Sequence, residues 1–130
     1  MVGEERYVLD SSGWIEWVSG GAGAAKFEPL IAVPDRLIVP AIAVYETVRW
    51  ALHGADANRA QRVAARMRLS QIVEIDADLA VAAAKLSIEH RLAMADSMIY
   101  ATARRFGAEL WTQDADFEGL VGVRYFPKVS

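Results

Sequence analysis

The sequence contains no cysteine, two histidines and four prolines among its 130 residues. The lack of cysteine excludes disulfides and thiolate metal sites, and it makes a reducing cytoplasm the expected compartment. No apolar run approaches the roughly 20 residues of a membrane-spanning helix, so no membrane association is expected. The chain starts with acidic rather than basic residues, from Met1 to Glu5, which predicts that this segment is not a secretory signal peptide.

The charge balance is mildly acidic, with a formal net charge of −3. This argues weakly against a general nucleic-acid-binding protein, because such proteins tend to be basic. A cluster of five acids would account for more than the whole deficit and would leave the remaining surface near neutral. Neither His53 nor His90 lies in a motif, and no histidine is paired with a serine in a way that suits covalent catalysis.

Strands and helices alternate along the chain, which predicts an α/β fold with helices on both faces of a mostly parallel sheet of four to five strands. No repeat or linker divides it, so residues 1–130 are expected to form one domain. We expect strands at 6–10, 37–39, 72–75, 109–112 and 123–126, and helices at about 12–19, 24–31, 41–53, 57–69, 76–90, 95–106 and 115–120. Ser11 or Ser12 is expected to cap the first helix.

Five carboxylates lie against apolar sequence, where an acid is costly unless it is exposed, paired or bound to a cation. These five acids are Asp10, Glu46, Asp96, Asp114 and Asp116. In a parallel sheet, functional groups gather outside the carboxyl ends of the strands. Asp10, Asp114 and Asp116 are expected there. Asp96, at the start of a helix, would lie at the same edge, and Glu46 would reach inwards from its own helix. Their mutual repulsion then calls for a divalent metal.

Each of these acids also has a plainer interpretation. Asp10, Asp96 and Asp114 lie where a carboxylate often caps a helix. Asp116 fits a solvated acid in a first turn, and Glu46 fits the solvent face of an amphipathic helix. The joint occurrence of all five in one order favours a site over five separate explanations.

Four segments resemble the four motifs of PIN-domain nucleases, in order and over almost the whole chain. These segments are Tyr7-Val8-Leu9-Asp10-Ser11-Ser12, Val44-Tyr45-Glu46-Thr47-Val48, Ala95-Asp96-Ser97-Met98-Ile99-Tyr100-Ala101-Thr102-Ala103 and Leu110-Trp111-Thr112-Gln113-Asp114-Ala115-Asp116-Phe117. Small single-domain members of this family are typically the VapC toxins of VapBC toxin–antitoxin pairs. The resemblance implies a PIN-like three-layer α/β/α sandwich.

The resemblance also implies which residues act. It matches the catalytic acids to Asp10, Glu46, Asp96 and Asp114, adds Asp116 as a further metal ligand, and gives supporting roles to Ser12 and Thr112. It implies a cytoplasmic endoribonuclease that uses Mg²⁺ or Mn²⁺, both of which prefer carboxylate oxygen and water. The implied partners are an RNA substrate, a VapB-type antitoxin lying across the active-site groove and a second copy of the chain in a homodimer.

Two further groups of side chains are candidates for binding. Arg59, Arg62 and Arg66 fall at helical spacing on one face, where they would contact RNA phosphates or simply be solvated. Three tryptophans, Trp14, Trp17 and Trp50, are expected in the core or in the groove for the antitoxin.

Two other functions remain open. One is a catalytically idle PIN domain that only binds nucleic acid or protein. The other is a Mg²⁺-binding receiver-like regulator, although this class needs an acidic pair at the first strand end, where the chain has Asp10 followed by Ser11 and Ser12.

Overall fold

A computed structural model describes residues 5–129. The expectation that the chain begins without a signal peptide falls on Met1 to Glu4, which lie outside the described residues. Within the described part, no helix combines the length and apolar character needed to cross a membrane.

Five parallel strands form one sheet in the order β3-β2-β1-β4-β5. The strands are β1 (Tyr7–Leu9), β2 (Leu37–Pro40), β3 (Gln71–Val73), β4 (Glu109–Thr112) and β5 (Val123–Tyr125). The expectation of a mostly parallel sheet is therefore confirmed. The order also contradicts the receiver-like alternative, because receiver folds place their strands in the order 2-1-3-4-5.

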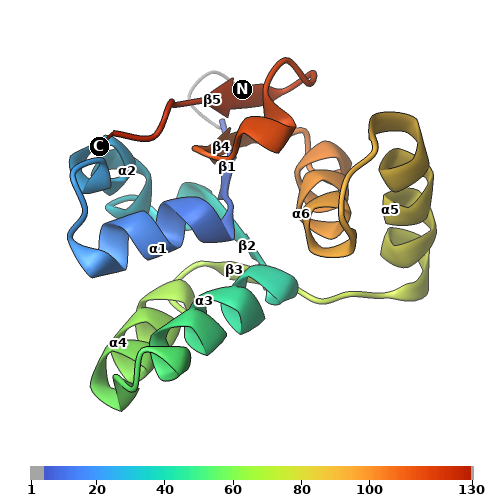
Figure 1. Cartoon of the computed structure of the whole chain (residues 1–130). Helices are drawn as coiled ribbons and strands as arrows, with labels where there is room; N and C mark the ends of the chain where they lie inside the picture. Colours follow the sequence, from blue (N-terminus) through green and yellow to red (C-terminus); the bar gives the residue numbers. More distant parts are fainter. Residues whose placement is uncertain (1–4, 130) are drawn as a thin grey trace.

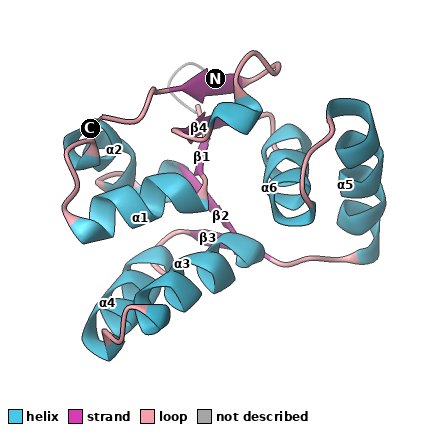
Figure 2. Ribbon diagram, viewed as in Figure 1, coloured by secondary structure: helices cyan, strands magenta, loops and turns pink. Residues whose placement is uncertain are grey.

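Six α-helices surround this sheet in the described part of the chain (Figure 1). They are α1 (Ser11–Ser19), α2 (Ala24–Ile31), α3 (Ala41–His53), α4 (Ala57–Met67), α5 (Ala77–His90) and α6 (Met94–Arg105), with two short 3₁₀ turns, η1 (Pro34–Arg36) and η2 (Ala115–Phe117). Helices α1 and α2 cover one face of the sheet, and α6 covers the other, with α5 packed on the outer side of α6 (Figure 2). The α3–α4 hairpin lies near β2 and β3, and α3 contacts both α1 and α6.

Three local predictions were wrong. The third strand was expected at residues 72–75, but it ends at Val73, and Ile75 is exposed. The helix expected at 115–120 is only the single 3₁₀ turn η2. Asp10, rather than Ser11 or Ser12, caps α1 by accepting a hydrogen bond from the backbone N–H of Gly13. A carboxylate that is almost completely buried needs such donors, and the first-turn amide supplies one of them.

The core is built from the central strands and the inward faces of the helices. Val8 and Leu9 of β1 and Leu110 of β4 are fully buried, as are Trp14 of α1 and Phe117 of η2. This burial fixes the ends of β1 and β4, from which the acidic loops emerge, so the core sets the position of the site.

We expect Leu110→Ala to lower the free energy of unfolding by about 2–5 kcal/mol, because it leaves a cavity beside the central strand. Ile88→Ala is the matched control, since its side chain is 84% exposed and its loss should change stability by less than about 0.5 kcal/mol. Urea unfolding followed by far-UV circular dichroism measures both variants. Equal losses would contradict this assignment of the core.

Candidate metal centre

The parallel pairing of β1 with β4 brings two loops to one edge of the sheet. Leu9 lies opposite Trp111 in this pairing, and the backbone N–H of Asp10 donates to the Trp111 carbonyl at 3.3 Å. Asp10 directly follows β1, and Asp114 follows β4 by two residues. The expectation that these acids share an edge is confirmed, because both strands run in the same direction.

Asp10 lies at the buried bottom of the site, with 2% of its surface exposed. Its Oδ1 accepts hydrogen bonds from the Ser12 hydroxyl at 2.8 Å and from the Gly13 N–H at 3.1 Å. Its Oδ2 accepts one from the Thr112 hydroxyl at 2.7 Å. These donors stabilise the carboxylate in its charged form and hold both oxygens in one orientation.

Asp96, Asp114 and Asp116 form the most compact group of acids in the described part of the chain. Each offers a carboxylate oxygen, and these three oxygens lie within 4.8 Å of one another. Asp96 stands in the first turn of α6, as predicted. Asp114 caps η2 by accepting from the N–H of Asp116 at 2.9 Å. The cap and the cluster therefore use the same side chain, so the two interpretations of Asp114 are compatible.

Glu46 reaches the site from α3, one turn inside the helix as predicted. Its Oε1 accepts a hydrogen bond from the Ser11 hydroxyl at 2.7 Å. Ser11 was considered only as a helix cap in the sequence, because a bond spanning 35 residues leaves no local pattern. The contact ties α3 to the start of α1 and orients the Glu46 carboxylate.

The acids influence one another electrostatically. Burial, followed by the charges of Asp114, Glu46, Asp10 and Asp116, raises the pKa of Asp96 to about 7. Burial raises the pKa of Asp10 to about 6, although hydrogen bonds from Thr112 and Ser12 oppose this rise. Four other acids thus act on Asp96, and the site is strongly negative when all five are ionised.

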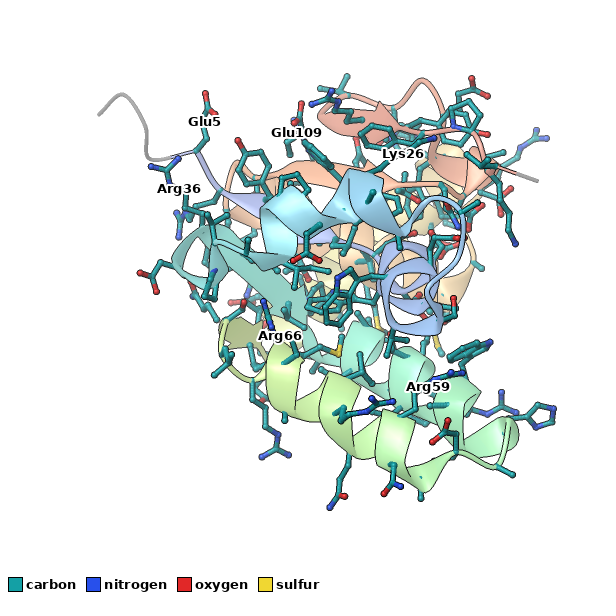
Figure 3. All side chains as sticks on the ribbon, turned by 90° about the vertical axis from the view of Figure 1, so that its left-hand side faces the viewer. Glu5, Lys26, Arg36, Arg59, Arg66 and Glu109 are labelled. Carbon is teal, nitrogen blue, oxygen red and sulfur yellow. The ribbon has the colours of Figure 1, made fainter. Side chains whose placement is uncertain are left out.

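The three arginines of α4 have partners inside the protein or lie on its surface. Arg59 lies 3.5 Å from Asp56, with its guanidinium 5.9 Å from the centre of the Trp50 ring. Arg66 lies 5.6 Å from the centre of the Trp17 ring, and its Nη2 donates to the carbonyl of Ile31. Figure 3 shows both arginines along α4. Arg62 is exposed.

The tryptophans divide between two environments. Trp14 is fully buried, as expected for a core residue. Trp17 and Trp50 are half-buried. The guanidinium of Arg66 lies over the ring of Trp17, and that of Arg59 lies over the ring of Trp50. Their contact with an antitoxin stays a prediction.

Comparison with known proteins identifies the fold. The family model of the PIN domain matches residues 7–122, which is most of the chain. The chain belongs to the PIN-domain family. The resemblance drawn from the four motifs is therefore confirmed. No curated protein sequence matches the chain at a significant level.

Solved structures of VapC and VapBC proteins have the same fold. A toxin–antitoxin complex from Klebsiella pneumoniae is 28% identical, with a TM-score of 0.77, and the match covers 91% of this chain and 95% of that one. VapC20 of Mycobacterium tuberculosis, a toxin that cleaves the sarcin–ricin loop, is 22% identical, with a TM-score of 0.73 and coverage of 91% and 98%. DNA-bound VapBC from Salmonella typhimurium is 18% identical, with a TM-score of 0.73 and coverage of 94% and 97%.

The raised pKa values predict how the stability of the metal-free protein depends on pH. Asp10 and Asp96 bind protons more tightly in the folded state than in the unfolded state. Their stabilising contribution is therefore complete below about pH 4 and is lost as pH rises through about 6 and about 7. With chelator present, we expect Asp96→Asn to melt a few degrees higher than wild type at about pH 8 and to lose much of the difference at about pH 5.

Differential scanning fluorimetry across this pH range measures the effect. Asp78→Asn is the control, because Asp78 is an exposed acid in the first turn of α5. An Asp96→Asn curve that ran parallel to the wild-type curve at every pH would contradict the electrostatic account.

Proposed function

We propose that the protein is a metal-dependent endoribonuclease and the toxin of a VapBC-type toxin–antitoxin pair. The observation that carries this proposal is the meeting of Asp96, Asp114 and Asp116 within 4.8 Å, beside the buried Asp10. All four belong to the motifs by which the chain resembles PIN-domain nucleases. The solved toxin structures with the same fold support the toxin role.

The donor set suits Mg²⁺ or Mn²⁺. It consists of carboxylate oxygens, which hard divalent cations prefer, and the described residues include no cysteine to favour a softer metal. Burial and the neighbouring carboxylates raise the pKa of Asp96, which supports a site whose charge a bound cation would offset. Asp96, Asp114 and Asp116 would hold the ion, with Asp10 and Glu46 beside them. When bound, the ion supplies the charge that polarises a phosphodiester and favours attack by water.

The remaining groups of the site orient these acids. Ser12 and Thr112 each donate to one oxygen of Asp10, so the carboxylate is fixed on both sides. The Thr112 oxygen also accepts from the N–H of Asp114 at 2.9 Å. Through its bond to Asp10, Thr112 therefore links the fourth motif to the first. Ser11 fixes Glu46. These bonds hold the carboxylates in fixed orientations, as a catalytic site requires.

The proposed partners are RNA, a cognate antitoxin and a second copy of the chain. A groove of about 700 Å³ between α3 and α4 offers an apolar surface for an antitoxin segment. Tyr45 and Leu52 line it and are 61% and 54% exposed, and Arg49 and Arg68 add positive charge. None of the five acids lines this groove.

RNA cleavage with and without metal tests the proposed activity. Wild type should cut RNA in Mg²⁺ or Mn²⁺, lose activity in chelator and lose it again as pH falls below about 6, where Asp10 and Asp96 become protonated. Asp96→Asn should abolish both cleavage and growth arrest on expression. An idle binding module would instead cut nothing and keep its effect on growth in this variant.

Charge reversal on α4 tests the proposed RNA contacts. Arg62→Glu should weaken RNA binding and lower the salt dependence of binding by about one unit of slope. It is a cleaner probe than Arg59 or Arg66, because both of those arginines contact tryptophans. Arg36→Glu is the control, since Figure 3 places Arg36 at the opposite margin from Arg59. Equal affinities for Arg62→Glu and wild type would remove α4 from the RNA-binding surface.

A further inference from the structure

Glu16 is a charged side chain in a place where the sequence gives no reason for one. It lies on α1, with 8% of its surface exposed. Its Oε1 accepts a hydrogen bond from the side-chain amide of Gln113 at 2.9 Å, and its Oε2 accepts one from the N–H of Gly23 at 3.2 Å. These two bonds lower the pKa of Glu16, so the buried group is a carboxylate.

The loop between α1 and α2 is shaped around this carboxylate. A Cβ atom at Gly21 would lie 1.7 Å from Glu16 Oε2. At Gly23, a Cβ atom would lie 3.4 Å from both Glu16 Cγ and the side-chain oxygen of Gln113. The two glycines thus leave the space in which Glu16 and Gln113 meet. Of the two, only Gly21 is so close that a side chain there would displace the Glu16 carboxylate.

Gln113 connects this carboxylate to the acidic loop. It stands between Thr112, which donates to Asp10, and Asp114 of the metal-binding group. Its backbone N–H donates to the Ser12 hydroxyl at 3.3 Å. Ser12 of the first motif therefore holds the backbone of Gln113, and Glu16 holds its side chain.

The acidic loop needs such an anchor. Asp114 is half-buried and Asp116 is exposed, and their carboxylates lie close to that of Asp96. Repulsion between these acids opposes their close approach. The bond from Gln113 to Glu16 ties the loop to a helix that is packed on the sheet.

We infer that Glu16 is a positioning residue for the metal centre, which acts through Gln113 on Asp114 and Asp116. The inference rests on the proposed metal-dependent function. It adds to the site two residues that lie outside the five acids. It also gives two glycines a role, since Gly21 leaves space for the Glu16 carboxylate and the N–H of Gly23 donates to it.

The test is the affinity for Mn²⁺, measured by isothermal titration calorimetry on the full chain. Glu16→Gln can satisfy only one of its two donors well, and Gln113→Asn is one methylene too short to reach Glu16. Both should raise the Kd for Mn²⁺ by about 10-fold, the size of effect expected when the orienting partner of a ligand is lost. Glu74→Gln, at an exposed glutamate, should leave the Kd unchanged.

A double-mutant cycle separates positioning from general support of the fold. If Glu16 acts through Gln113, then Glu16→Gln should cost little further affinity in the Gln113→Asn background. Additive losses, or a lower melting temperature with an unchanged Kd, would overturn the positioning role. Should Glu16→Gln fail to fold, Gln113→Asn alone decides, because its side chain is half-buried and lies outside the core.

The result also distinguishes this inference from the proposed function. Wild type that binds Mn²⁺ and cuts RNA, together with variants of unchanged Kd, would reject the role of Glu16 alone. Wild type that binds no Mn²⁺ would reject the metal centre and the positioning role together.

Discussion

The repulsion between carboxylates that the fold forces together is the constraint on which the site depends. Parallel β1 and β4 end at one edge of the sheet, so the acids that follow them must emerge side by side. Helix α6 adds Asp96 and α3 adds Glu46 to the same region. Burial, followed by the charges of these neighbouring acids, raises the pKa of Asp96 to about 7. The proposed cation would relieve this repulsion by binding the native state.

The surrounding structure keeps these acids in place. Two hydroxyl groups hold the innermost acid, since Ser12 and Thr112 both donate to Asp10. Thr112 also accepts from Asp114, so one side chain joins two strands and two motifs. Further out, Ser11 holds Glu46, and Glu16 holds Gln113. On the loop after β4, Asp114 is half-buried and Asp116 is exposed.

Much of the fold was predictable because its signals are local. The buried strand before Asp10, the helix from Ala41 to His53 and the alternation of elements follow from apolar patterns and stop signals. The α/β class and the shared edge of Asp10 and Asp114 follow from that alternation. The strand at 72–75 was misplaced because Ile75 has the composition of a strand residue but faces solvent beyond the last pairing.

The rest of the site depends on contacts between distant residues. Ser11 to Glu46, Glu16 to Gln113 and Thr112 to Asp10 span 35, 97 and 102 residues, and no spacing rule announces them. For α1, the sequence offered Ser11, Ser12 and Asp10 as caps, and only the coordinates show that the buried Asp10 takes this role. The sequence thus predicted which acids lie near one another, while the side chains that orient them required coordinates.

The most direct test of this account is a crystal structure of the wild-type chain grown with Mn²⁺, with anomalous diffraction recorded to locate the ion. The account predicts an anomalous peak at about 2.1 Å from carboxylate oxygens of Asp96 and Asp114, with Asp116 and Asp10 facing it. A map without a peak among these acids would contradict it. So would an ion bound elsewhere with Asp96, Asp114 and Asp116 apart from one another.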